Sequence, residues 1–91
     1  MNKELYISVI FQGIRDAASK NERLVYKAFD WFGSTDFEIV CQKAELNHKS
    51  LRKSLLGLLS SDNPKQTAED MISAIRGTFW QKESKASLVL N

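Results

Sequence analysis

The sequence contains few of the residues that build tight turns, disulfides and histidine-based sites. Among its 91 residues it has one cysteine, one proline, one histidine and four glycines. A single cysteine cannot form an internal disulfide, which favours a reducing, cytoplasmic setting. β-Sandwiches and barrels need many turns rich in glycine and proline, so the scarcity of both residues favours a helical domain. No stretch reaches the roughly 18 uninterrupted apolar residues of a membrane span, and no signal-peptide core follows the N-terminus, so we expect no membrane partner.

Residues typical of catalytic and metal sites are also scarce. The sequence has no glycine-rich phosphate loop, no nucleophile elbow and no His–Glu metal pair on a helix. His48 has neither a cysteine nor a second histidine at ligand spacing. Cys41 lies at a small-residue position of an apolar stripe, so we expect a core residue and not a nucleophile. We therefore predict a protein that is not an enzyme and that has no catalytic residue, metal or cofactor.

Length and composition predict one globular domain that carries an uneven charge. Hydrophobic residues make up 43% of the chain and charged residues 26%, values that exclude a disordered protein. The formal net charge is +2. Residues 42–61 carry four basic side chains against one acidic side chain, whereas the rest of the chain is nearly balanced. The concentration of positive charge in one short stretch indicates an anionic partner.

The spacing of apolar residues predicts an all-α fold, a compact bundle of about five helices. Apolar side chains recur every three or four residues in each segment, as on one face of a helix. The expected N-caps are Ser19, with Asn21 as its alternative, and then Thr35, Asn47 and Thr67. We expect residues 1–80 to form a single domain and residues 81–91 to be a loosely ordered tail. The expected helices cover residues 3–18, 36–44 and 48–60, with a further helix that ends at Gly33 and a fifth that follows Thr67. Leu58, Leu59 and Phe79 are among the expected core residues.

The segment 36–60 has the pattern of a helix-turn-helix unit, in which two short helices are joined by a turn of three to four residues. Cys41 and Ala44 are small, which lets the second helix cross close to the first. Leu46 lies in the turn, where it fills the corner between the helices. Leu51 and Leu55 anchor the second helix to the core, so the opposite face is left for a partner. That face is expected to present His48, Lys49, Arg52 and Lys53.

Residues 28–55 resemble the corresponding part of small helix-turn-helix proteins of phages and prophages. The resemblance is carried by a Trp, a Ser-Asp-Phe-like stretch and a Val-Cys pair before the turn, found here within Trp31–Cys41. It implies a DNA-binding protein, in particular a transcriptional regulator of phage or mobile-element type. In that family a glycine usually follows the alanine of the turn, because glycine adopts a left-handed backbone without steric cost. Here that residue is Glu45, whose carboxylate would oppose the approach of DNA phosphates.

On this interpretation the binding partner is duplex DNA. The helix 36–44 would lie across the DNA backbone, and the helix 48–60 would enter the major groove. Arg52 is the candidate for bidentate recognition of a guanine, with His48, Lys49 and Ser50 close to base edges. Lys43 and Lys53 are expected to contact phosphates, which position a protein without reading sequence.

A second interpretation keeps the fold and changes the partner. The chain could be a protein-interaction module, a phage-type modulator of a host complex that uses the helix-turn-helix fold without binding DNA. The small basic surplus, the position of Glu45 and the spare aromatic side chains Tyr6, Trp31 and Trp80 favour this alternative.

A homodimer is also expected, because one helix-turn-helix unit reads only a few base pairs. The candidate dimer surfaces lie outside residues 36–55. One is the first helix, where Leu5, Tyr6 and Val9 are apolar beyond the predicted core stripe. The other is the end of the fifth helix, with Trp80 and the apolar residues 88–90.

Overall fold

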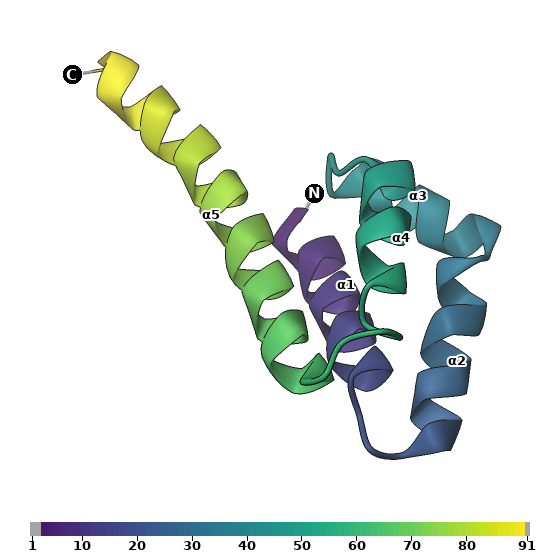
Figure 1. The fold of residues 1–91 in the computed structure, drawn as a ribbon. Helices are drawn as coiled ribbons and strands as arrows, with labels where there is room; N and C mark the ends of the chain where they lie inside the picture. The colour runs from purple at the N-terminus through teal and green to yellow at the C-terminus, as the bar shows by residue number, and fades with distance from the viewer. Residues whose placement is uncertain (1–2, 91) are drawn as a thin grey trace.

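In a computed structural model, the chain folds into α-helices, with no strand among residues 3–90. The structure describes the backbone of residues 3–90 and the side chains of residues 3–77. The all-α prediction is confirmed, and no described helix is both long enough and apolar enough to cross a membrane. The helices, in chain order, are α1 (Lys3–Ala17), α2 (Glu22–Phe32), α3 (Thr35–Lys43), α4 (His48–Leu56) and α5 (Pro64–Leu90) (Figure 1).

Helices α2, α3 and α4 each begin at a polar side chain that accepts a hydrogen bond from an N–H of the first turn. Asn47, the predicted N-cap of α4, is confirmed. At α2 the alternative Asn21 is the cap, and the prediction of Ser19 is wrong, because the Ser19 hydroxyl accepts from the Asn21 N–H, which precedes the helix. The prediction of Thr35 as a cap is wrong, because the preceding hydroxyl, that of Ser34, accepts the bond from the Phe37 N–H at 3.3 Å. These bonds satisfy N–H groups that have no partner within the helix, and so fix where each helix starts.

The fifth helix begins four residues earlier than the predicted cap at Thr67 implies. The Asn63 side chain accepts a hydrogen bond from the Gln66 N–H at 3.2 Å, and Pro64 occupies the first helical position. Proline suits that position because the N–H that it lacks would have no partner there. Thr67, the predicted cap, lies inside the helix, and its hydroxyl is 2.6 Å from the hydroxyl of Ser61.

The end of α5 also differs from the expected boundary. The backbone of residues 81–90, predicted to be a loosely ordered tail, continues the helix to Leu90. Its last turns extend beyond the other four helices (Figure 1). The side chains of Phe79 and Trp80, one a predicted core residue and the other a predicted dimer contact, lie outside the described side chains, as do those of residues 88–90.

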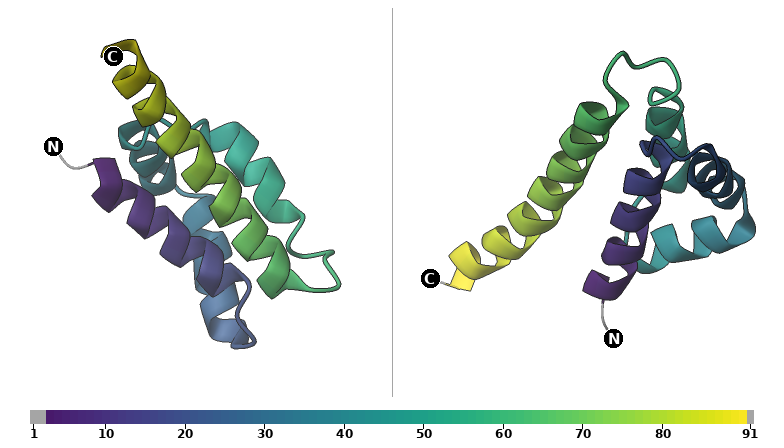
Figure 2. Two further views of the ribbon diagram at one scale, coloured as in Figure 1. Left: turned by 90° about the vertical axis from the view of Figure 1, so that its left-hand side faces the viewer. Right: turned by 90° about the horizontal axis from the view of Figure 1, so that it is seen from below.

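The core is built around α1, which contacts α2, α3 and α5. Helices α2 and α5 lie on opposite sides of α1 (Figure 2). Helix α4 packs against α3 and adds Leu51 and Leu55 to the core. The largest fully buried side chains come from all five helices; they are Ile10, Ile14, Phe32, Phe37, Cys41, Leu55 and Ile72.

The apolar stripe of α4 is shorter than predicted. The helix ends at Leu56 and not at residue 60, and Gly57 forms its C-terminal cap. Leu58 still reaches the core, but the predicted core residue Leu59 is 66% exposed. The stripe therefore ends where the helical spacing ends.

A close approach between α1 and α2 depends on the absence of a side chain at Gly13. The half-buried ring of Trp31 lies over this glycine and packs edge-on against Phe37, with ring centroids 5.2 Å apart. A Cβ atom at Gly13 would lie 3.0 Å from Cζ3 of Trp31 and 3.2 Å from Cε1 of Phe32. Phe32 is only 2% exposed, so it has little room to move away.

Gly13→Ala is therefore expected to lower the free energy of unfolding by about 1–2 kcal/mol, because overpacking outweighs the gain in helix propensity. Gly77→Ala is the matched control, since a Cβ at that helical glycine meets nothing within 4 Å. It should raise stability by about 0.5–1 kcal/mol. Urea unfolding followed by circular dichroism measures both. Equal stabilisation by the two substitutions would contradict the close packing of Trp31 on α1.

Candidate nucleic-acid interface

The turn between α3 and α4 depends on one residue with a left-handed backbone. Among the described residues, Glu45 is the only non-glycine residue with a positive φ, at 59°. The Leu46 N–H donates to the Cys41 carbonyl oxygen at 2.8 Å, and the Glu45 N–H donates to that of Gln42 at 3.1 Å. These two bonds form the Schellman motif, which ends a helix with a left-handed residue that is usually glycine. The sequence-based prediction of a left-handed residue at this position is confirmed.

The carboxylate of Glu45 is tethered to α1. One of its oxygens lies 3.0 Å from the Nζ atom of Lys3, although the Glu45 side chain remains 64% exposed. The ion pair links the turn to the first residue of α1, and it balances a negative charge that would otherwise face an anionic partner unopposed. The repulsion expected from Glu45 is thus weaker than its position in the sequence suggests.

Small buried side chains let α3 and α4 pack closely. Cys41 is fully buried and Ala44 is 1% exposed, as predicted for the residues at the crossing of the two helices. Desolvation by burial raises the pKa of the Cys41 thiol to about 11, an effect that the nearby charge of Arg52 partly opposes. The thiol is therefore neutral near pH 7, which fits a core residue and not a nucleophile.

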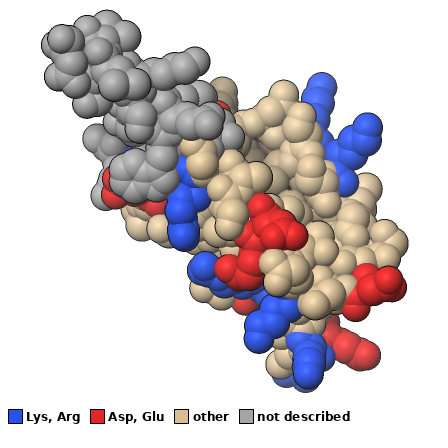
Figure 3. Space-filling view, turned by 60° about the vertical axis from the view of Figure 1, so that its left-hand side comes forward, with Lys and Arg blue, Asp and Glu red and all other residues tan. Residues whose placement is uncertain are grey.

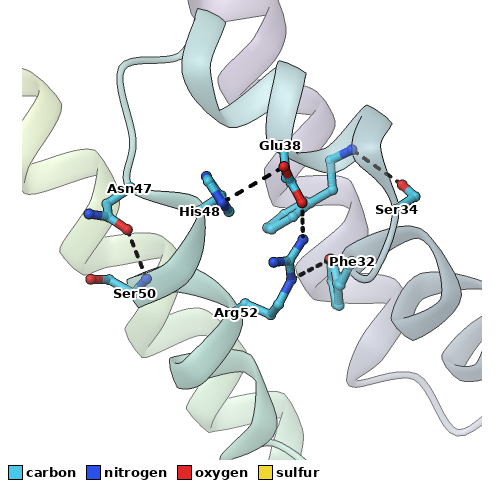
Figure 4. A network of polar contacts seen from close by, with 8 residues as sticks. Phe32, Ser34, Glu38, Asn47, His48, Ser50 and Arg52 are labelled. Carbon is cyan, nitrogen blue, oxygen red and sulfur yellow. Dashed lines mark hydrogen bonds and ion pairs between the residues drawn. The ribbon is translucent and has the colours of Figure 1, made fainter.

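Arg52 faces the fold instead of pointing away from it, which differs from its predicted position on the free face. Its Nε atom donates a hydrogen bond to the Phe32 carbonyl oxygen at 2.7 Å. Its terminal Nη2 atom lies 3.4 Å from Oε2 of Glu38, and the guanidinium carbon is 5.4 Å from the centroid of the Phe37 ring. Figure 4 shows the side chain reaching from α4 to the end of α2 and to α3. A bidentate contact with guanine would require Arg52 to leave these partners.

His48 turns toward the same carboxylate. It is the first residue of α4, and its Nε2 atom lies 4.0 Å from Oε1 of Glu38. Glu38 thus lies between His48 and Arg52 (Figure 4). In the sequence, Glu38 is only an acidic residue near the start of the helix predicted for residues 36–44. Its contacts with α4 join residues far apart in the chain, and no local signal marks them.

The outward surface of α4 carries the other predicted contact residues. Lys49, Ser50 and Lys53 are exposed, and so is Lys43 at the end of α3. Lys49 and Lys53 are four residues apart, so they lie on the same face of α4. Within residues 3–77, none of the three lysines forms an ion pair. No acidic residue occurs between residues 46 and 61, so α4 carries no negatively charged side chain.

The surrounding surface carries charges of both signs. Figure 3 shows Lys and Arg interleaved with Asp and Glu on the face drawn, with no single broad basic area. Among the residues with described side chains, no group of three or more His, Cys, Asp and Glu residues could hold a metal ion.

The conformation of the turn gives a direct test. Glu45→Gly should raise the free energy of unfolding by up to about 1 kcal/mol, because glycine adopts a left-handed backbone without the steric cost that a Cβ atom brings. Glu45→Ala is the control: it removes the carboxylate but keeps the Cβ atom, so it should lower stability by up to about 1 kcal/mol or leave it unchanged. Chemical denaturation measures both variants. If Glu45→Gly is no more stable than Glu45→Ala, the left-handed turn is not where the structure places it.

No protein-family model, curated protein sequence or solved structure matches this chain. Its function is therefore inferred from the chemistry of the surface formed by α3 and α4.

Proposed function

We propose that the protein is a small helix-turn-helix DNA-binding protein, a transcriptional regulator of phage or mobile-element type. The observation that carries this proposal is the outward face of α4, where Lys49, Ser50 and Lys53 are exposed on a helix that has no acidic residue. An exposed basic helix of this size fits the major groove of B-DNA. The short turn that connects α4 to α3 supports the proposal, because it resembles the link between the two helices of such units.

The exposed residues have two roles in this proposal: some contact phosphates and others contact base edges. Lys43 and Lys53 neutralise phosphates and position the protein on the duplex. Lys49 and Ser50 lie in the first turn of α4, where recognition helices contact base edges. Arg52 and His48 contact Glu38 and so contribute less positive charge to the outer surface than their residue types suggest.

Exposed apolar side chains favour the alternative, a protein-interaction module that modulates a host complex. Leu5 on α1 and Leu56 on α4 are 59% and 57% exposed, and Tyr26 on α2 is 74% exposed. Such residues are typical contacts of protein interfaces, whereas DNA interfaces depend on positive charge. Binding to duplex DNA at low salt distinguishes the two functions, because the alternative requires none.

Lysine substitutions test the DNA interface. Neutralising two or three phosphates predicts a slope of log affinity against log salt between about −1.8 and −2.7 per protomer. In Lys49→Gln/Lys53→Gln the slope should become shallower by about 0.9–1.8, since one or two phosphate contacts are lost. Lys27→Gln/Lys65→Gln removes the same net charge from exposed positions on α2 and α5, and its slope should stay that of the unmodified protein. Fluorescence anisotropy with a labelled duplex at several salt concentrations measures each slope. Salt-independent affinity, or no binding at about 50 mM salt, would exclude the DNA-binding function.

The proposal includes a homodimer, because a single unit with few cations would bind DNA weakly. Leu5 and Val9 lie one turn apart on α1 and are 59% and 41% exposed, which makes this face the candidate dimer surface. Leu5→Lys should therefore weaken self-association and DNA affinity together. Leu24→Lys, the same substitution at an exposed leucine of α2, should change neither. Sedimentation equilibrium at micromolar concentration measures association. A monomer that binds one DNA site with nanomolar affinity would contradict the coupling of dimerisation to binding.

A further inference from the structure

The carboxylate of Glu38 occupies a position between two nitrogen-bearing side chains of α4. Its Oε2 atom lies 3.4 Å from Nη2 of Arg52, and its Oε1 atom lies 4.0 Å from Nε2 of His48 (Figure 4). All three side chains are between 31% and 44% exposed. An oxyanion is thus held at the junction of α3 and α4, in a place that solvent and a large partner can reach.

The surroundings of this carboxylate are suited to a larger anion. Beside it is an open hollow of about 290 Å³ on the outer side of α3. The Thr35 hydroxyl and the Gln42 amide line it and can donate hydrogen bonds, as can the His48 imidazole. Glu38 contributes the only carboxylate of the lining, which consists of Thr35, Glu38, Ile39, Gln42, Leu46 and His48.

We propose that Arg52 and His48 form a phosphate-binding site that Glu38 fills in the free protein, and that a phosphate of the DNA backbone takes the place of the carboxylate on binding. This inference rests on the proposed DNA-binding function. A guanidinium binds carboxylate and phosphate oxygens with the same geometry, so the exchange needs no new type of contact.

The geometry of Arg52 allows the exchange without releasing α4. The Nε atom stays bonded to the Phe32 carbonyl oxygen, while the terminal Nη2 atom moves from a carboxylate oxygen to a phosphate oxygen. The side chain thus has one contact that holds the helix and another that the partner can take over. Glu38 acts as a competitor of DNA, and it reduces the affinity of the interface.

Helix α3 offers a matched control for the charge of Glu38. Asp36 is also an acidic residue in the first turn of α3, and its side chain is exposed. Within residues 3–77 it forms no ion pair with α4. Asp36→Asn and Glu38→Gln therefore raise the net charge equally and from the same helical turn, but only Glu38→Gln removes the negative charge that lies between Arg52 and His48.

The test compares the affinity of the two variants for a labelled duplex at about 100 mM salt, with thermal melting to confirm that both fold. Glu38→Gln should bind about fivefold more tightly than the unmodified protein, the size of effect expected from loss of one exposed ion pair. Asp36→Asn should bind less than about twofold more tightly, because a charge without a close partner is screened by salt. Introducing Glu38→Gln into an Arg52→Gln background should give no such gain.

Each contrary result has a distinct meaning. Equal gains for Glu38→Gln and Asp36→Asn would reduce the effect to net charge and overturn the proposed site. Weaker binding by Glu38→Gln would also overturn it, since Glu38 would then help to form the DNA surface. Titration with inorganic phosphate separates the sources of the anion: tighter binding of the free ion by Glu38→Gln, without tighter DNA binding, would overturn the DNA-backbone assignment. If neither the unmodified protein nor any variant binds duplex DNA, the proposed function itself is wrong.

Discussion

The hydrogen bond from the Arg52 Nε atom to the Phe32 carbonyl oxygen determines how α4 is held. It joins the middle of α4 to the last residue of α2, where carbonyl groups lack partners within their own helix. The positive charge is also favourable there, because it faces the negative end of the helix dipole. With Leu51 and Leu55 buried on the adjacent side, α4 is fixed in orientation, and Lys49 and Lys53 are directed away from the core.

This constraint limits the charge that the surface of α4 can offer. Arg52, the arginine of α4, is held within the fold and lies beside Glu38. The positive charge of the outer face therefore comes from lysines. Lysine binds phosphates as a point charge and lacks the planar fork with which arginine reads guanine. On the proposed function, a protomer would bind duplex DNA chiefly through charge and would discriminate little between bases.

The local features of the fold could be predicted from the sequence, and the long-range contacts could not. Asn47 as a helix cap follows from the chemistry of its side chain, and Glu45 as a left-handed residue follows from the resemblance of the turn to those of helix-turn-helix proteins. The orientation of Arg52 does not, because its partners Phe32 and Glu38 are 20 and 14 residues away in the chain. The exposure of Leu59 was also missed, since helical spacing was continued past the point where α4 ends.

The outward face of α4 is the surface that we propose contacts DNA. Titration of the isotopically labelled protein with a duplex, followed through backbone amide resonances by NMR, tests this claim most directly. If α4 contacts DNA, the largest changes in amide chemical shift occur at Lys49, Ser50 and Lys53, with smaller changes at the start of α3. Shifts confined to the exposed face of α2 around Tyr26, or to α1 around Leu5, would contradict it.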